Sequence, residues 1–415
     1  MTSEAPARHV LDPTGQDGHG EIDRLRVDGP VVRVEMPGGL PAWLVLGYAE
    51  VVQLLKTRKK DPLVVKDITQ WADHSAGRVP EDWPLLMWAQ NAGMFTADPP
   101  RHRDLRTWAS KAFTPRRVQA LAPVIEQIVT DRLDAMAPAA AAGQVVDLRA
   151  EFCLPVPIQA IGALLGVPED LTPTFRRGAD ALFDTAIPPA EAQVRFGALL
   201  GAIQEMVERK KTAPGRDLTS DMVRMLGTKD AYTEEVLLET VRLTIVAGYE
   251  TTGNLIDQAV FSLLTHPQHL AAVRAGDLSW GAVIDETLRC AGVAANLPIR
   301  YAACDFTLGG ARIKQGDAIL VSFAGTGRDP ARFDRPGVFD PTRAGVREHL
   351  GFGYGDHYCL GSPLAVLEAE IALRALFDRY PDLSLAADPD SYPSNPGTIT
   401  NGHAFLTVRL GAARA

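Results

Sequence analysis

The sequence of 415 residues contains only four cysteines, and no two of them form a C-x-x-C pair. Thiols that are so few and so widely spaced do not make a disulfide framework, and they favour a reducing, cytoplasmic compartment. Long apolar runs are also absent. The N-terminus lacks the apolar segment of a signal peptide, and charged residues interrupt the most apolar helical stretch, residues 237–264. We therefore expect neither a secretory leader nor a membrane anchor.

Basic residues are fewer than acidic ones. The sequence has 42 Lys and Arg residues and 51 Asp and Glu residues, which gives a net charge of −9. A chain with this balance has no global positive field that would attract nucleic acid or an anionic membrane. The hydrophobic fraction of 46% is ordinary for a globular protein with a large core.

Hydrophobic periodicity predicts a mainly α protein with a small β region. The expected strands lie at residues 31–36, 42–47, 305–322 and 403–410, and the expected helices at 48–57, 101–112, 116–137, 157–165, 191–211, 219–226 and 361–380. Thr233 is a plausible N-cap of one further helix of about thirty residues, which His266 and Pro267 end. We expect a single domain over residues 1–415, with residues 1–20 as a flexible N-terminal extension.

Residues 61–98 show no regular period and are rich in tryptophan, proline and glycine. A long loop with so much aromatic surface is interpreted as a ligand-facing element. The alternative is a loop that its tryptophans pin to the core.

The most specific segment is FGYGDHYCLG, residues 352–361, which delivers Cys359 to the start of a helix. Free N–H groups and the partial positive charge of a helix N-terminus stabilise a thiolate, which is the form of cysteine that binds metals. Gly353, Gly355 and Gly361 allow the backbone to approach a flat ligand closely. The other three cysteines are interpreted as buried, small apolar residues.

A second motif, AGYETT at residues 247–252, lies in the long helix. Glycine inside a helix costs about 1 kcal/mol relative to alanine, and a groove for a bound diatomic molecule would explain Gly248. Glu250 and Thr251 form an acid–alcohol pair that could relay protons. The plainer alternative is that Thr251 only bonds back to a carbonyl of its own helix.

With these motifs, the sequence resembles the cytochrome P-450 family of haem-thiolate monooxygenases, and especially its soluble bacterial members of secondary metabolism. Residues 352–361 match the family's F-G-x-G-x-H-x-C-x-G pattern, and residues 247–252 match A-G-x-[DE]-T-[TS]. The resemblance implies the cytochrome P-450 fold, with haem b (iron protoporphyrin IX) between the long helix and the cysteine-loop helix. It implies Cys359 as the iron ligand and Glu250 and Thr251 as catalytic residues. The cofactor-binding residues that it implies are His102, Arg106, Ala247, Gly248, Arg300, Phe352, Gly353, His357, Cys359 and Gly361.

The resemblance also implies a buried structural triad of Glu286, Arg289 and Arg343, in which E-x-x-R alone would be a weak signal. One departure is Gly327, where many members have asparagine. Substrate contacts are expected from residues that are mostly apolar: Trp88, Met94, Phe95, Phe183, Leu243, Val246, Ala294, Asn296, Leu297, Ile399 and Thr400.

The function implied is activation of O₂ to hydroxylate or otherwise oxidise a medium-sized apolar natural product. Two alternatives stay open: radical coupling of aromatic substrates such as tryptophan-containing cyclic dipeptides and, more remotely, a non-enzymatic haem sensor. Because the chain shows neither a flavin domain nor an iron–sulfur cysteine set, we expect a ferredoxin and its reductase as electron donors. The basic residues Lys111, Arg116, Arg117 and Arg347 could dock such an acidic partner.

Overall fold

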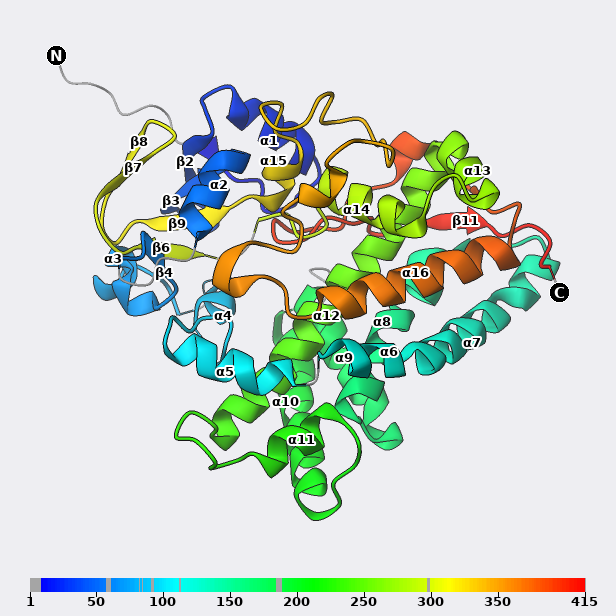
Figure 1. Ribbon diagram of the computed structural model, residues 1–415, viewed down its shortest axis with the longest axis horizontal. Helices are drawn as coiled ribbons and strands as arrows, with labels where there is room; N and C mark the ends of the chain where they lie inside the picture. Colours follow the sequence, from blue (N-terminus) through cyan, green and yellow to red (C-terminus); the bar gives the residue numbers. More distant parts are fainter. Residues whose placement is uncertain are drawn as a thin grey trace.

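The computed structural model describes residues 9–56, 61–81, 83, 85–90, 93–111, 113–183, 189–296 and 299–414. Helices dominate one side of the molecule, and the main β-sheet lies at the other side together with the N-terminal helices (Figure 1). The expected mainly α architecture with a small β region is confirmed.

The main sheet has six strands in the order β1-β2-β3-β9-β6-β4. The β2–β3 hairpin is antiparallel, and β3 pairs with β9 in parallel. At the far edge Val65 of β4 lies opposite Tyr301 of β6, which brings Lys66 and Arg300 to the same end of the sheet. The six strands are β1 (His9–Val10), β2 (Val31–Met36), β3 (Leu40–Val45), β4 (Val64–Val65), β6 (Arg300–Ala302) and β9 (Ala318–Val321).

Two smaller sheets complete the β structure. One has the order β10-β11-β5, and the other is the β7–β8 hairpin. Their strands are β5 (Val145–Asp147), β7 (Phe306–Leu308), β8 (Ala311–Ile313), β10 (Ser384–Leu385) and β11 (Thr407–Arg409).

The helices of the first half are α1 (Gly18–Arg26), α2 (Tyr48–Leu55), α3 (Ala72–Ser75), α4 (Leu86–Ala89), α5 (Arg101–Ser110), α6 (Pro115–Ala120), α7 (Ala122–Ala141), α8 (Pro155–Leu165), α9 (Thr172–Phe183) and α10 (Pro189–Thr212). Those of the second half are α11 (Leu218–Arg224), α12 (Glu234–Thr265), α13 (Pro267–Ala275), α14 (Trp280–Cys290), α15 (Phe323–Gly327) and α16 (Ser362–Arg379). A π-helical turn, Arg149–Cys153, precedes α8, and short 3₁₀ turns lie at Ile68–Gln70, Glu169–Leu171, Val346–Glu348, Gly355–His357 and Pro389–Ser391.

The long helix α12 runs through the interior of the helical side (Figure 1). Thr233 caps it as predicted, because its side chain accepts the N–H of Val236, and the helix ends before His266. A Cβ on Gly253 would lie 2.7 Å from Leu154 Cδ2 and 3.2 Å from the carbonyl oxygen of Cys153. This glycine therefore lets α12 pack tightly against the start of α8.

Two sequence predictions are wrong in their boundaries. The helix expected over residues 116–137 is split at Leu121 into α6 and α7, because Pro123 lacks the N–H that a continuous helix would need there. The flexible extension expected over residues 1–20 is too long, because β1 pairs with β2, Leu11 is buried and α1 begins at Gly18. Residues 1–8 lie outside the described part of the chain.

The tryptophan-rich loop is only partly what the sequence suggested. Trp71 and Trp83 are buried in the core under the main sheet, with ring centroids 5.2 Å apart, and Trp71 stacks on Tyr301 at 5.6 Å. Interpreting these two side chains as ligand-facing is therefore wrong, and the pinned-loop alternative holds for them. Within the described residues, no helix is both long and apolar enough to cross a membrane.

Candidate active site

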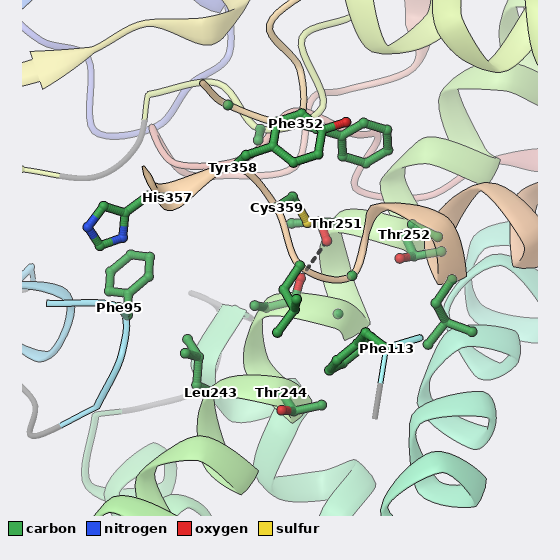
Figure 2. Close-up of a pocket in the computed structure, with 18 of the residues that line it drawn as sticks. Phe95, Phe113, Leu243, Thr244, Thr251, Thr252, Phe352, His357, Tyr358 and Cys359 are labelled. Atoms are coloured by element: carbon green, nitrogen blue, oxygen red, sulfur yellow. Dashed lines mark hydrogen bonds between the residues drawn. The ribbon is translucent and has the colours of Figure 1, made fainter. Parts of the chain in front are cut away.

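A cavity with about 1580 Å³ of non-atom space, its open mouth included, lies between α12 and the loop that carries Cys359. Helices α5, α8 and α16 and strand β6 contribute further walls. Figure 2 shows Cys359, Phe352 and Tyr358 on one side and Leu243, Thr244 and Thr251 of α12 on the other. The cavity therefore joins the two motifs that the sequence singled out.

Local backbone geometry delivers Cys359 to this cavity. Gly353 and Gly355 have φ angles of 81° and 73°, which L side chains rarely adopt. The Cys359 amide donates to the Phe352 carbonyl oxygen at 2.8 Å, and the loop then enters α16.

The electrostatics of the Cys359 sulfur differ from the sequence prediction. The predicted N–H groups are present, because backbone donors at Gly361 and Ser362 act on the sulfur and lower its pKa. Burial is the larger effect, however, and it raises the pKa of the thiol above its ordinary value. The predicted stabilisation of the thiolate by the helix N-terminus is thus present, but burial outweighs it, and a bound metal cation would add the further stabilisation that favours the thiolate.

Histidine and arginine side chains gather at one end of the cavity, to which α5, β6 and the cysteine loop contribute His102, Arg106, Arg300 and His357. His102 is 1% exposed, neither of its ring nitrogens has a hydrogen-bond partner among the described residues, and its ring lies 4.1 Å from that of His357. Burial lowers the pKa of His102 to about 4 and that of Arg300 to about 10. His102 therefore brings two buried ring nitrogens to this end of the cavity, and neither has an acceptor among the described residues.

Lys66 is a cation at the same end that sequence reasoning missed. Its side chain is buried and lines the cavity, and Nζ has no hydrogen-bond partner in the described part of the chain. Nζ lies 3.9 Å from the ring centroid of Phe95. The Asp98 carboxylate instead accepts the backbone N–H groups of Lys66, at 2.9 Å, and Asp67, at 3.1 Å. Burial holds the pKa of the amine well below its ordinary value. No sequence signal marks this lysine, because it lies in a loop without periodicity.

These residues fit an iron porphyrin. Cys359 offers a soft sulfur ligand, and the buried donors of Lys66, His102, Arg300 and His357 suit the two propionate carboxylates. When bound, such a haem supplies O₂ activation and oxidation of the substrate.

On α12, Thr251 and Glu250 take different directions. Thr251 lines the cavity, and its hydroxyl donates to the Ala247 carbonyl oxygen at 2.5 Å, the dashed line in Figure 2. Glu250 is 1% exposed and is not among the described residues that line the cavity. Burial raises the pKa of its carboxyl, although Arg149 opposes the shift. The structure therefore does not place the predicted acid–alcohol pair together in the cavity.

Gly248 lines the cavity beside Thr251, but a Cβ there would lie 2.7 Å from Ile161 Cδ1. Close packing of α12 against α8 is thus a second reason for glycine at this position.

The expected substrate contacts fall into three groups. Met94, Phe95, Leu243 and Ala294 line the cavity. The leucine at position 297 and the side chain of Phe183 lie outside the described residues. The remaining five contribute no described lining atoms: Trp88, Val246, Asn296, Ile399 and Thr400.

Glu286, Arg289 and Arg343 come together as expected. Arg289 donates twice to the Glu286 carboxylate, each time at 2.7 Å, and Arg343 Nε lies 3.5 Å from Glu286 Oε1. A Cβ on Gly327 would lie only 1.9 Å from the Arg289 carbonyl oxygen, which gives a steric reason for glycine where many family members have asparagine.

A second residue missed from the sequence is Glu368 of α16. It is 1% exposed and lines the cavity, and Oε2 has no partner among the described residues. Burial raises the pKa of this carboxyl well above its ordinary value.

Comparisons with known proteins agree with this site. The family model for cytochrome P-450 matches residues 281–400. The 2-hydroxy-5-methyl-1-naphthoate 7-hydroxylase of Streptomyces carzinostaticus is 38% identical over 96% of this chain and 97% of its own length. The 6-deoxyerythronolide B hydroxylase of Saccharopolyspora erythraea is 36% identical over 95% and 96%.

Two solved structures are also similar. CYP154A1 from Streptomyces coelicolor A3(2) superposes with a TM-score of 0.88 at 42% identity and covers 97% of this chain and 100% of its own. CYP154C4 from a Streptomyces species has a TM-score of 0.92 at 36% identity and covers 99% and 100%. With relatives of this identity over almost its whole length, the chain belongs to the cytochrome P-450 family of haem-dependent monooxygenases.

Proposed function

We propose that this monooxygenase hydroxylates a medium-sized, apolar natural product of secondary metabolism. The observation that carries the proposal is the apolar part of the cavity lining. Met94, Phe95, Leu243, Ala247 and Ala294 form an apolar surface there. Such a surface binds its ligand mainly by excluding water, and a few polar groups fix the orientation. The relatives named above hydroxylate 2-hydroxy-5-methyl-1-naphthoate and 6-deoxyerythronolide B, as their names state.

A panel of macrolides, terpenoids, steroids and polycyclic aromatics tests this proposal through the haem spectrum. A compound that fills the cavity displaces the water on the iron, and the spin state shifts. We expect saturable shifts from apolar compounds of intermediate size and none from small polar ones. The opposite ranking would contradict the proposal. Product mass then separates the reactions, because hydroxylation adds one oxygen atom whereas radical coupling gives a dimer without added oxygen.

We further propose roles for the residues of the cavity. Cys359 ligates the iron, and the cationic end with His102, Arg300 and His357 holds the propionates. Thr251 presents a hydroxyl to the cavity, where it would relay protons for the O₂ activation that a bound haem would supply. Replacing Thr251 with valine removes the hydroxyl at nearly constant volume. We expect the ratio of product formed to O₂ consumed to fall, with unchanged spin-state titrations.

Electron supply by a ferredoxin and its reductase is also part of the proposal. The basic residues suggested for docking are at the surface: Arg347 is 84% exposed and Arg117 46% exposed, and each contacts an acidic residue of this chain. Lys111 and Arg116 are exposed as well. We expect that changing these four residues to glutamate slows reduction of the iron without altering substrate titrations. Lys314→Glu, beyond β8, is the matched control. Equal reduction rates in all variants would rule out this docking surface.

A further inference from the structure

The Glu250 carboxylate is restrained by side chains from distant parts of the chain. Its Oε1 atom accepts hydrogen bonds from Asn395 Nδ2 at 2.7 Å, Thr400 Oγ1 at 2.9 Å and Asn254 Nδ2 at 3.5 Å. Arg149 Nη2 lies 3.9 Å from the same oxygen. Oε2 has no partner among the described residues, although it is buried. The carboxylate is therefore held through one oxygen only.

The segment that contributes Thr400 also supports the cavity wall. Thr400 forms an antiparallel β-bridge with Ala294, and the Asn401 amide donates to the Val293 carbonyl oxygen at 3.0 Å. Val293 and Ala294 both line the cavity. Backbone contacts therefore join this wall directly to Thr400.

The other charged groups around Glu250 meet the same segment. His403 donates its backbone N–H to Asp257 Oδ2 at 2.9 Å, and its Nδ1 lies 3.0 Å from that oxygen. Arg149 Nη1 lies 3.7 Å from Asp257 Oδ2. Arg149, Asp257 and His403 thus form the charged surroundings of Glu250, and residues 395–403 link them to the wall.

We infer that Thr400 is a positioning residue that couples the filling of the cavity to the release of Glu250. An occupant that presses on Val293 and Ala294 moves the bridged segment and lengthens the bond from Thr400 Oγ1 to Glu250 Oε1. The freed carboxyl can then turn toward Thr251 and give a proton to its hydroxyl oxygen as the hydroxyl passes its own proton on into the cavity. The carboxylate is then reprotonated from solvent. Proton delivery would thereby wait until the cavity is filled. The inference depends on the proposed function only in that an apolar molecule fills this cavity.

Three variants isolate the Thr400 hydroxyl. Thr400→Val removes it at nearly constant volume, whereas Thr400→Ser retains it. Thr240→Val is the matched control, because Thr240 is also buried but donates only to the Val236 carbonyl of its own helix, at 2.7 Å. All three are studied as the haem-loaded enzyme.

The first readout is the carboxylic acid band of Glu250 in the infrared spectrum, which is assigned by its loss in Glu250→Gln. Removing one donor to the carboxylate favours the protonated form. We expect the titration midpoint of the band to rise by about one pKa unit in Thr400→Val. Thr400→Ser and Thr240→Val should titrate like the wild type. An unchanged midpoint in Thr400→Val would overturn the inference.

The second readout tests the coupling with two azoles that ligate the iron, so that binding is seen directly in the absorption spectrum. Econazole has bulky apolar arms that reach the wall, whereas imidazole is too small to do so. We expect econazole, but not imidazole, to shift the Glu250 band in the wild type, and neither to shift it in Thr400→Val. An equal econazole shift in both proteins would refute the coupling. Because neither readout needs turnover, failure of the proposed substrate class leaves this test intact.

Discussion

Replacing Lys66 with methionine is expected to stabilise the haem-free protein but to weaken its binding of haem. In the haem-free protein the buried ammonium has no hydrogen-bond partner among the described residues. At pH 7 the free-energy cost of burying the ammonium cannot exceed the cost of deprotonating the amine, because the buried group can become neutral instead. About 3.5 units separate the ordinary lysine pKa of 10.5 from pH 7, and each unit is worth about 1.4 kcal/mol. Lys66→Met should therefore raise the free energy of unfolding of the haem-free protein, by at most about 5 kcal/mol.

The increase in the free energy of unfolding that Lys66→Met gives the haem-free protein should depend on pH. Because folding lowers the pKa of Lys66 below its ordinary value of 10.5, the unfolded chain binds more protons than the folded chain between those two values. The contribution of this group to stability therefore increases with pH across that window. The advantage of methionine should be full below it and should vanish near pH 10.5. Urea unfolding of the haem-free proteins at several pH values measures this dependence.

Haem binding should be weakened, because a propionate would lose its ammonium partner. A hydrogen bond to a charged group is worth about 1.5 to 3 kcal/mol, which corresponds to roughly 10- to 150-fold weaker haem binding in Lys66→Met. Transfer of haem to an excess of apomyoglobin measures the dissociation rate. Lys314→Met is the control, because Lys314 is 70% exposed and pairs with Asp305 at the surface. If Lys66→Met loses haem no faster than the control, Lys66 does not hold a propionate.

Three further predictions concern stability. Glu286→Gln breaks a fully buried ion pair and should lower the free energy of unfolding by about 3 to 5 kcal/mol. A shift of the urea midpoint measures this change, and a loss below about 1 kcal/mol would contradict the structural role of the triad. Gly327→Ala should cost about 1 to 3 kcal/mol, because the new Cβ clashes with the Arg289 carbonyl, and an unchanged melting temperature would show that the backbone yields. Trp71→Ala should lower the free energy of unfolding by about 3 to 5 kcal/mol, because Trp71 is buried in the core. Spin-state titrations of the variant should keep the midpoints of the wild type. A shifted midpoint with unchanged stability would support the ligand-facing interpretation instead.

Local signals were sufficient for much of this protein. The spacing of residues 352–361 marked Cys359, and the helical motif marked Gly248 and Thr251, because chemistry at these positions depends on neighbours along the chain. All ten predicted cofactor-binding residues line one cavity, although their roles stay predictions. Caps and breakers placed the ends of α12 for the same local reason.

Only the tertiary structure decided which side chains are paired and which are left without partners. Lys66 becomes a buried cation because β4 pairs with β6 across more than 200 residues of sequence. Glu250 turns from the cavity because Arg149, Asn395 and Thr400, all remote in sequence, converge on its carboxylate. Trp71 belongs to the core because Tyr301 lies beneath it. Burial and pairing depend on the whole fold, and a motif specifies only the residues within it.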